Sequence, residues 1–188
     1  MHAAVVAQID LVQIREKNLT ASVLYQLASS AAGLTKGSAT RLLINDRSDI
    51  AAAAGADGVH LTTSSLPTAV VRQTFGGGFL IGVSTHSMEE VRLARQSGAD
   101  FAVFGPVFET ASKKELVEPP GLTGLARVCS ELSPFPILAL GGVMIGNVAE
   151  CIRAGARGVA AIRMLQRPAQ LAYVADEIRS SDPQNKTN

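Results

Sequence analysis

The chain has 188 residues, of which 47% are hydrophobic and 18% are charged, and its formal net charge at pH 7 is +1. That is enough apolar material for one domain, and the balanced charge excludes a global field that attracts nucleic acid or an anionic membrane. The sequence contains neither a membrane span of about 18 apolar residues nor a signal peptide after Met1. Cys129 and Cys151 lack ligand-like spacing, which favours two reduced thiols. We therefore expect a cytoplasmic protein with no nucleic-acid or membrane partner.

A short pattern recurs where an expected helix gives way to an expected strand. A small residue, a glycine and an alanine precede an apolar run at Gly55, Gly98 and Gly155. Glycine supplies the left-handed backbone conformation that ends a helix, and the apolar run is typical of a buried strand. Repeated helix–strand units of this length favour a parallel sheet or barrel.

The apolar runs predict seven strands. In chain order these are Asp10–Glu16, Thr40–Asp46, Gly58–Thr62, Leu80–His86, Phe101–Phe108, Ile137–Val143 and Gly158–Leu165. Helical patterns fill the intervals, among them Ser87–Gln96, Leu122–Leu132 and Gly146–Ala154. Ser87 and Glu90 have the spacing of a capping box at the start of the first of these helices. Because few residues precede Asp10, we expect an α/β fold, a (β/α)8 TIM-type barrel that lacks its first β-strand.

The missing strand would leave a gap beside the strand that begins at Asp10. Such a gap exposes unpaired backbone groups on two strands, which proteins normally cover. We expect the cover to come from the residues before Asp10, from the C-terminal segment or from a second subunit. Residues 1–179 are expected to form a single barrel domain, since no linker divides them, and residues 180–188 a polar tail.

Cationic and amide side chains follow the first expected strand. Functional residues of parallel α/β folds lie at the carboxyl ends of the strands. Alternation along the strand places Gln13, Arg15 and Lys17 on one face. Two interpretations are open: a solvated strand end, or a clamp for a polyphosphate, whose oxygens pair with such cations.

Two other strand ends carry titratable groups. Asn45 and Asp46 follow the second strand; this pair is common in turns, but beside the cationic strand Asp46 is also a candidate Mg²⁺ ligand. His86 lies between a strand end and a helix start, where it is either structural or a general acid–base.

The last candidates are phosphate-binding groups. The loop after Phe101–Phe108 contains the hydroxyls of Thr110 and Ser112 and the amine of Lys113, and its alternative interpretation is a mobile surface loop. Gly141 and Gly142 end a later strand, and paired glycines there let backbone N–H groups approach a phosphate.

Six ordered motifs, spanning roughly residues 8–166, resemble those of the thiamine-phosphate synthase/TenI superfamily. They read Gln-Ile-Arg-Glu-Lys at 13–17, Ile-Asn-Asp-Arg at 44–47, Gly-Val-His-Leu at 58–61, Gly-Val-Ser-Thr-His at 82–86, Phe-Gly-Pro-Val-Phe at 104–108 and Ala-Leu-Gly-Gly-Val at 139–143. The resemblance implies a (β/α)8 barrel enzyme of thiamine biosynthesis, usually a homodimer, that binds thiazole phosphate.

The two branches of this superfamily differ in their reaction. The resemblance implies that a synthase joins an aminopyrimidine diphosphate to thiazole phosphate and releases pyrophosphate. It assigns the diphosphate to Gln13, Arg15, Lys17, Asn45 and Lys113, one Mg²⁺ bond to Asp46, and the thiazole phosphate to Gly142. A TenI-type protein instead isomerises a thiazole carboxylate tautomer; His86 would then shuttle the proton and Lys113 would anchor a charged group.

The chain departs from the synthase pattern at several positions. Ser65 stands where the synthases carry an acid that is the second Mg²⁺ ligand, and a neutral hydroxyl is a poor replacement. Thr63 replaces a glutamine, and the loop Glu109–Lys113 looks more like the TenI branch. Arg163 replaces a phosphate-binding serine, and two interpretations are open: the arginine binds the phosphate itself, or it blocks the site. Asp46, in contrast, keeps the synthase form.

These departures favour a TenI-type thiazole tautomerase, with a thiamine-phosphate synthase as the alternative. A non-catalytic thiazole-phosphate-binding regulatory protein is a second alternative, because it would keep the pocket without the chemistry. An unrelated phosphate-binding barrel isomerase is a third, and the motifs at 13–17 and 44–47 argue against it. Any Mg²⁺ is expected to bind weakly, since Asp46 would be its one carboxylate ligand.

Overall fold

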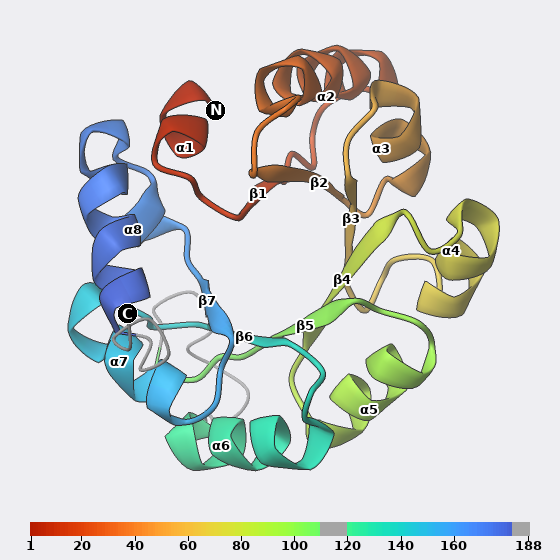
Figure 1. The fold of residues 1–188 in the computed structure, drawn as a ribbon. Helices are drawn as coiled ribbons and strands as arrows, with labels where there is room; N and C mark the ends of the chain where they lie inside the picture. The colour runs from red at the N-terminus through yellow and green to blue at the C-terminus, as the bar shows by residue number, and fades with distance from the viewer. Residues whose placement is uncertain (110–119, 182–188) are drawn as a thin grey trace.

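The computed structural model describes residues 1–109 and 120–181, in which seven strands form one parallel sheet. The strands are β1 (Leu11–Ile14), β2 (Arg41–Asn45), β3 (Gly58–Leu61), β4 (Leu80–Thr85), β5 (Phe101–Phe104), β6 (Ile137–Leu140) and β7 (Gly158–Ala160). Each strand pairs with the next one in the chain, so the order in the sheet is the order in the sequence. The sheet curls, and its helices form an outer ring (Figure 1). The expected α/β barrel architecture is confirmed.

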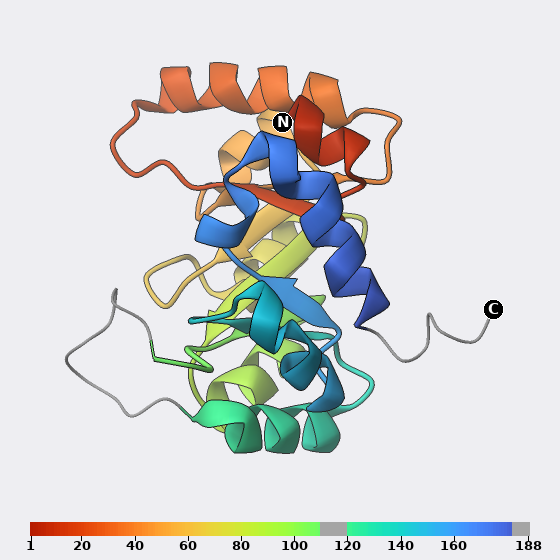
Figure 2. The same ribbon diagram turned by 90° about the vertical axis from the view of Figure 1, so that its left-hand side faces the viewer.

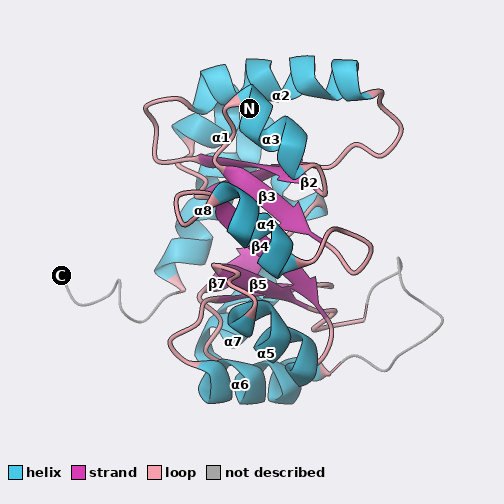
Figure 3. Ribbon diagram, turned by 90° about the vertical axis from the view of Figure 1, so that its right-hand side faces the viewer, coloured by secondary structure: helices cyan, strands magenta, loops and turns pink. Residues whose placement is uncertain are grey.

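The helices lie on the outer side of the strands, as the side views show (Figures 2 and 3). They are α1 (His2–Val6), α2 (Ala21–Thr35), α3 (Ser48–Ala54), α4 (Thr68–Phe75), α5 (Met88–Gln96), α6 (Gly121–Leu132), α7 (Ile145–Arg153) and α8 (Leu171–Ser180), with 3-10 turns η2 (Arg163–Leu165) and η3 (Pro168–Gln170). Because α8 ends at Ser180, the expected start of the polar tail falls at a helix end. Residues 182–188 of that tail lie outside the described residues, and the single-domain boundary remains a prediction.

All seven expected strands are longer than the observed ones, and two of them differ most. The strand expected over Phe101–Phe108 ends at Phe104, and Pro106 beyond it has no N–H to continue a ladder. The strand expected over Gly158–Leu165 ends at Ala160, and Arg163 begins a 3-10 turn instead. The apolar run in each case continues into a loop that packs on the core, which periodicity alone does not distinguish from a strand.

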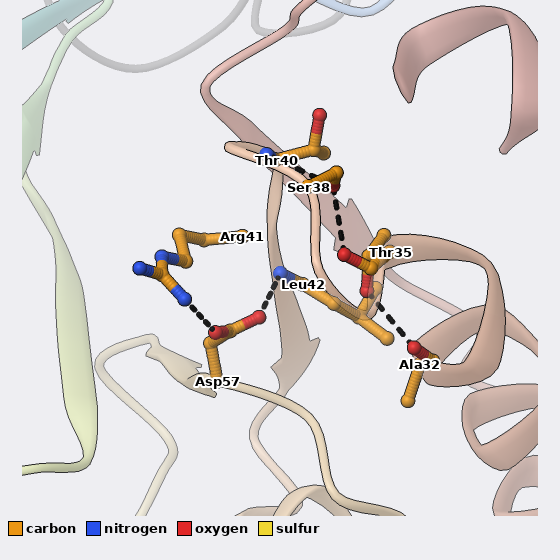
Figure 4. Close-up of polar contacts among 7 residues, drawn as sticks. All are labelled: Ala32, Thr35, Ser38, Thr40, Arg41, Leu42 and Asp57. Atoms are coloured by element: carbon orange, nitrogen blue, oxygen red, sulfur yellow. Dashed lines mark hydrogen bonds and ion pairs between the residues drawn. The ribbon is translucent and has the colours of Figure 1, made fainter. Parts of the chain in front are cut away.

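The recurrent glycine pattern has the conformation expected of it, and it also has a second function. Gly55, Gly98 and Gly155 all have positive φ, from 70° to 97°. Two residues after the first of them, the carboxylate of Asp57 accepts hydrogen bonds from the backbone N–H of Leu42 at 2.8 Å and from Arg41 at 2.9 Å (Figure 4). Asp100 repeats this arrangement on the next pair of strands. Its carboxylate accepts from the backbone N–H of Ile81 at 2.7 Å. Asp57 and Asp100 therefore tie the starts of β3 and β5 to the preceding strands β2 and β4.

The core has an outer and an inner part. Between the sheet and the helices, the outward side chains of β2, β3 and β4 pack against α2, α3 and α4 in one cluster, and a second cluster lies under α5, α6 and α7. Inside the curl, Leu43, Phe101 and Val103 are buried together with apolar side chains from β1, β4, β6 and β7. The interior is therefore filled by side chains, as in a packed barrel.

The gap between β1 and β7 is covered on its outer side. These two strands are the edges of the sheet, and no pairing joins them within the described ranges. Ala4, Ala7 and Leu171 are buried together there, with Val12 of β1 and Leu165 beyond β7 packed against them. Figures 1 and 2 show α1 beside α8 at this place. The cover thus comes from the residues before Asp10 and from the C-terminal helix, two of the three sources expected.

Candidate active site

A layer of polar side chains lies at the carboxyl ends of β1, β2, β3 and β4. Gln13, Asn45, His60 and Ser84 come one from each strand, and alternation puts them on the inner face with Leu43. The Gln13 side-chain N–H donates to Asn45 Oδ1 at 2.8 Å, and His60 Nε2 is hydrogen-bonded to Ser84 Oγ at 2.8 Å. These two hydrogen-bonded pairs therefore line the interior of the barrel at this end.

Asp46 lies beside this layer and is surrounded by hydrogen-bond donors. Its φ is +59°, a left-handed conformation that Asp tolerates better than most residues. Asn45 Nδ2 donates to Asp46 Oδ2 at 2.6 Å, and Thr62 Oγ1 donates to Oδ1 at 3.0 Å. The Ser65 hydroxyl also donates to Oδ1. Both carboxylate oxygens therefore already accept hydrogen bonds from protein side chains.

His60 is held neutral inside the layer. It is 6% exposed, and its ring centroid lies 6.2 Å from that of Phe101. Burial lowers the pKa of His60 to about 4; the nearby Asp46 charge raises this pKa and the Arg15 charge lowers it. Gly82 makes room for the ring, because a Cβ there would lie 2.8 Å from His60 Nδ1. At neutral pH His60 is an uncharged hydrogen-bonding group.

The predicted cations reach the same end of the barrel. Arg15 and Lys17 are exposed directly after β1, and Arg163 is exposed in η2 directly after β7. In the part of the chain that the structure describes, none of these three side chains has an ion pair or hydrogen bond. Unpaired cations at this end are suited to bind an anionic ligand.

His86 stands where β4 gives way to α5. Ser87 is the N-cap of α5, and its hydroxyl accepts from the Glu90 N–H at 3.2 Å, as the capping-box pattern predicts. The Glu90 carboxylate accepts from the His86 backbone N–H at 2.6 Å. His86 Nδ1 is hydrogen-bonded to the Gly105 carbonyl. A carbonyl only accepts, so Nδ1 carries the hydrogen and Nε2 is the basic nitrogen of the neutral ring.

Gly141 and Gly142 have a steric reason to be glycines. Their φ angles are +95° and +65°. A Cβ on Gly141 would lie 2.6 Å from Pro106, and one on Gly142 would lie 2.6 Å from Phe108 Cβ. The Gly142 carbonyl accepts from Asn147 Nδ2 at 3.1 Å, which ties the turn to the start of α7. The pair thus fits the β6 turn against the β5 loop; its role in phosphate binding remains a prediction.

The residues predicted from the sequence and the residues that the structure brings together overlap only in part. Thr110, Ser112 and Lys113 lie outside the described residues. His60 and Thr62 were given no role in the sequence, although the structure places both against Asp46 or the polar layer. Val59 and Leu61 are apolar and lie in the outer cluster, so alternation along β3 puts His60 on the inner face, and this alternation could have marked it.

Comparison with known proteins identifies the family of the chain. A family described as thiamine monophosphate synthase matches residues 1–165. The chain belongs to the thiamine monophosphate synthase family. This confirms the resemblance and the assignment to an enzyme of thiamine biosynthesis. None of the helices in the described ranges is long and apolar enough to cross a membrane.

Individual relatives cover most of the chain. A Geobacter sulfurreducens protein named as a candidate thiamine-phosphate synthase is 47% identical over 162 residues, 86% of this chain and 76% of that protein. A thiamine-phosphate synthase of Chloroflexus aurantiacus is 35% identical, over 96% of this chain and 82% of its own. The solved thiamine phosphate pyrophosphorylase of Pyrococcus furiosus is 28% identical with a TM-score of 0.84, over 96% of this chain and 86% of its own. These names favour the synthase over the expected tautomerase.

Proposed function

We propose that the chain is a thiamine-phosphate synthase, which joins an aminopyrimidine diphosphate to thiazole phosphate and releases pyrophosphate. The observation that carries the proposal is the hydrogen-bonded row from Gln13 through Asn45 to Asp46, with the unpaired Arg15 and Lys17 beside it. The family and the names of the relatives support the same reaction.

The chemistry required is the departure of an anion. Release of pyrophosphate breaks a carbon–oxygen bond and leaves the electron pair on the diphosphate. Cations that neutralise this charge make the diphosphate a better leaving group. Arg15 and Lys17 would supply that charge from the end of β1. Gln13 and Asn45, fixed by their mutual hydrogen bond, would orient the same group.

The tautomerase remains a second candidate because of His86. His86 Nδ1–H donates a hydrogen bond to the Gly105 carbonyl. Nε2 would therefore be the nitrogen that acts as a base at the carboxyl end of β4. A non-catalytic binding protein, the other alternative, would use the same cations to bind its ligand but would catalyse neither reaction. Synthase, tautomerase and binder therefore predict different results with the same purified protein.

The test measures pyrophosphate release by the full chain with both synthase substrates. We expect release, and a fall in kcat/KM of roughly 10- to 100-fold for Arg15→Gln or Lys17→Gln, because each removes a charged hydrogen bond to the diphosphate. Lys36→Gln is the matched control, an exposed cation just after α2, and should leave the rate unchanged. No pyrophosphate, together with interconversion of the thiazole carboxylate tautomers, would assign the tautomerase. Binding without either reaction would assign the regulatory protein.

The proposed enzyme is a homodimer, and α2 offers a surface for the second copy. This helix contains no charged residue over Ala21–Thr35. It exposes Val23, Leu27 and Leu34 at helical spacing, each next to a residue of its buried face. Light scattering of the purified chain should give twice the mass of the 19.6 kDa protomer, and Leu27→Glu should reduce that value.

A further inference from the structure

The loop after β3 supplies hydroxyls, and no carboxylate, to the surroundings of Asp46. Thr62 Oγ1 lies 3.2 Å from Ser64 Oγ and 3.2 Å from Ser65 Oγ. The Ser65 hydroxyl accepts from the Thr62 backbone N–H at 2.7 Å and donates to Asp46. The loop is therefore folded onto the carboxylate by its own hydrogen bonds.

These surroundings do not fit a free Mg²⁺ ion. Magnesium requires near-octahedral oxygen ligands and dehydrates reluctantly, so its protein sites depend on carboxylates. The described ranges contain no group of three or more His, Cys, Asp or Glu placed to share a metal. A cation bound to Asp46 Oδ1 would also have to displace the hydroxyl donors of Thr62 and Ser65, which leaves these hydroxyls without their acceptor.

We propose that Ser65 makes Asp46 a hydrogen-bonded carboxylate that takes no free divalent cation, so that a cation arrives here only in complex with a diphosphate. In that complex the diphosphate oxygens would supply most of the ligands, and Asp46 would supply one. The first half of this inference stands on the geometry of residues 46 and 62–65. The second half rests on the proposed function.

Substitution of Ser65 by Asp tests the first half directly. Mn²⁺ serves as the probe, and the free ion is followed by electron paramagnetic resonance without any substrate. We expect millimolar or weaker binding to the wild-type chain and a Kd lowered roughly tenfold or more in Ser65→Asp, because the affinity of oxygen sites rises with ligand charge. Ser64→Asp is the matched control, since it adds the same charge one residue away at an exposed side chain without a bond to Asp46.

Two results would overturn the first half. One is tight Mn²⁺ binding to the wild-type chain that Asp46→Asn abolishes. The other is an equal effect of Ser64→Asp and Ser65→Asp, which would show that added charge acts without regard to position. Melting temperatures of all variants establish that each is folded. A failure to form thiamine phosphate leaves these measurements intact, so the two proposals fail separately.

The second half is tested by adding inorganic pyrophosphate to the same titrations. The wild-type chain should bind Mn²⁺ with pyrophosphate far more tightly than Mn²⁺ alone, and Asp46→Asn should reduce this gain. Pyrophosphate that binds equally well with and without Mn²⁺, and is insensitive to Asp46→Asn, would show that Asp46 takes no part in holding the cation.

Discussion

His60 is a titratable ring enclosed by the strands of the barrel and held in its uncharged form. In the unfolded chain this imidazole has an ordinary pKa of 6.5, whereas burial lowers it to about 4 in the folded chain. Between these values the unfolded chain binds a proton that the folded chain does not. Stability contributed by neutral His60 is therefore complete above pH 6.5 and is lost as the pH falls toward 4.

The first prediction follows from this difference. Urea unfolding at several pH values should show the free energy of unfolding falling between pH 6.5 and 4, by on the order of 3 kcal/mol from this group. His60→Gln, which cannot titrate, should remove most of that dependence whatever its stability at pH 7. His2→Gln changes an exposed imidazole and should leave the slope as in the wild type. An unchanged slope in His60→Gln would mean that other groups cause the acid sensitivity.

The residue types at the strand ends indicated part of the site. The remaining contacts depend on how neighbouring strands pair, which the sequence does not show. Gln13, Arg15 and Asn45 could be selected because amides and cations at a strand end are unusual enough to suggest an anion. The bond between His60 and Ser84 joins residues on different strands and requires the pairing of His60 with Gly82. The hydroxyls around Asp46 likewise come from a turn whose path the sequence does not specify. The serine in place of an acid at position 65 was visible in the sequence, but the hydrogen bond from its hydroxyl to Asp46 was not.

At the scale of elements, the turn after β6 requires glycine for two reasons, a positive φ and close packing against the β5 loop. Gly142 has φ of +65°, and a Cβ there would lie 2.8 Å from the Glu109 carbonyl as well as 2.6 Å from Phe108. A side chain would therefore strain this turn and push the β5 loop away. Both elements lie at the end of the barrel where the substrates are proposed to bind.

The second prediction is that Gly142→Ala destabilises the protein by about 1–3 kcal/mol, the range for a non-glycine residue forced into such a conformation. Its affinity for thiazole phosphate, measured by calorimetry, should fall as the loop shifts. Gly146→Ala provides the control four residues later. That glycine lies in α7 with open space around its Cβ position, so alanine there should stabilise by about 0.4–1 kcal/mol. Equal effects of the two substitutions would contradict the steric argument.

The elements themselves were largely predictable because β2, β3 and β5 are buried on both faces and because α3, α4, α5 and α7 each end at or just before a glycine. Expected and observed strands correspond one to one, and the errors lie at their ends. The role of Asp57 and Asp100 was not predictable, since an aspartate after Gly-Ala is equally compatible with a solvated turn. The structure shows that each carboxylate accepts a hydrogen bond from a backbone N–H at the start of the neighbouring strand. Without the aspartate, that N–H would be unpaired at the end of the sheet.

For the whole molecule, the decisive feature is a barrel whose two edge strands are not joined to each other. The expected gap is present, and residues near both ends of the chain pack together over it. Arg179 of α8 donates to the carbonyls of Ala7 and Gln8, directly after α1. Carbonyls at a helix end lack partners in their own helix, and an arginine is well suited to bind them. The contact therefore joins residues more than 170 positions apart.

The last prediction concerns this contact. Arg179→Met keeps much of the apolar stem but removes the donors, so the carbonyls of Ala7 and Gln8 would depend on water. Because the side chain is partly exposed, we expect a loss of about 1 kcal/mol and a melting temperature lower by about 2–4 °C. Arg153→Met, an exposed cation in the last turn of α7, is the control and should change little. Hydrogen exchange locates the effect: the amides of β1 should exchange faster in Arg179→Met, while those of β3 and β4, remote from the gap, should keep their protection. Uniform acceleration over the whole sheet would instead show that the contact stabilises the fold globally and has no particular role at the open edge.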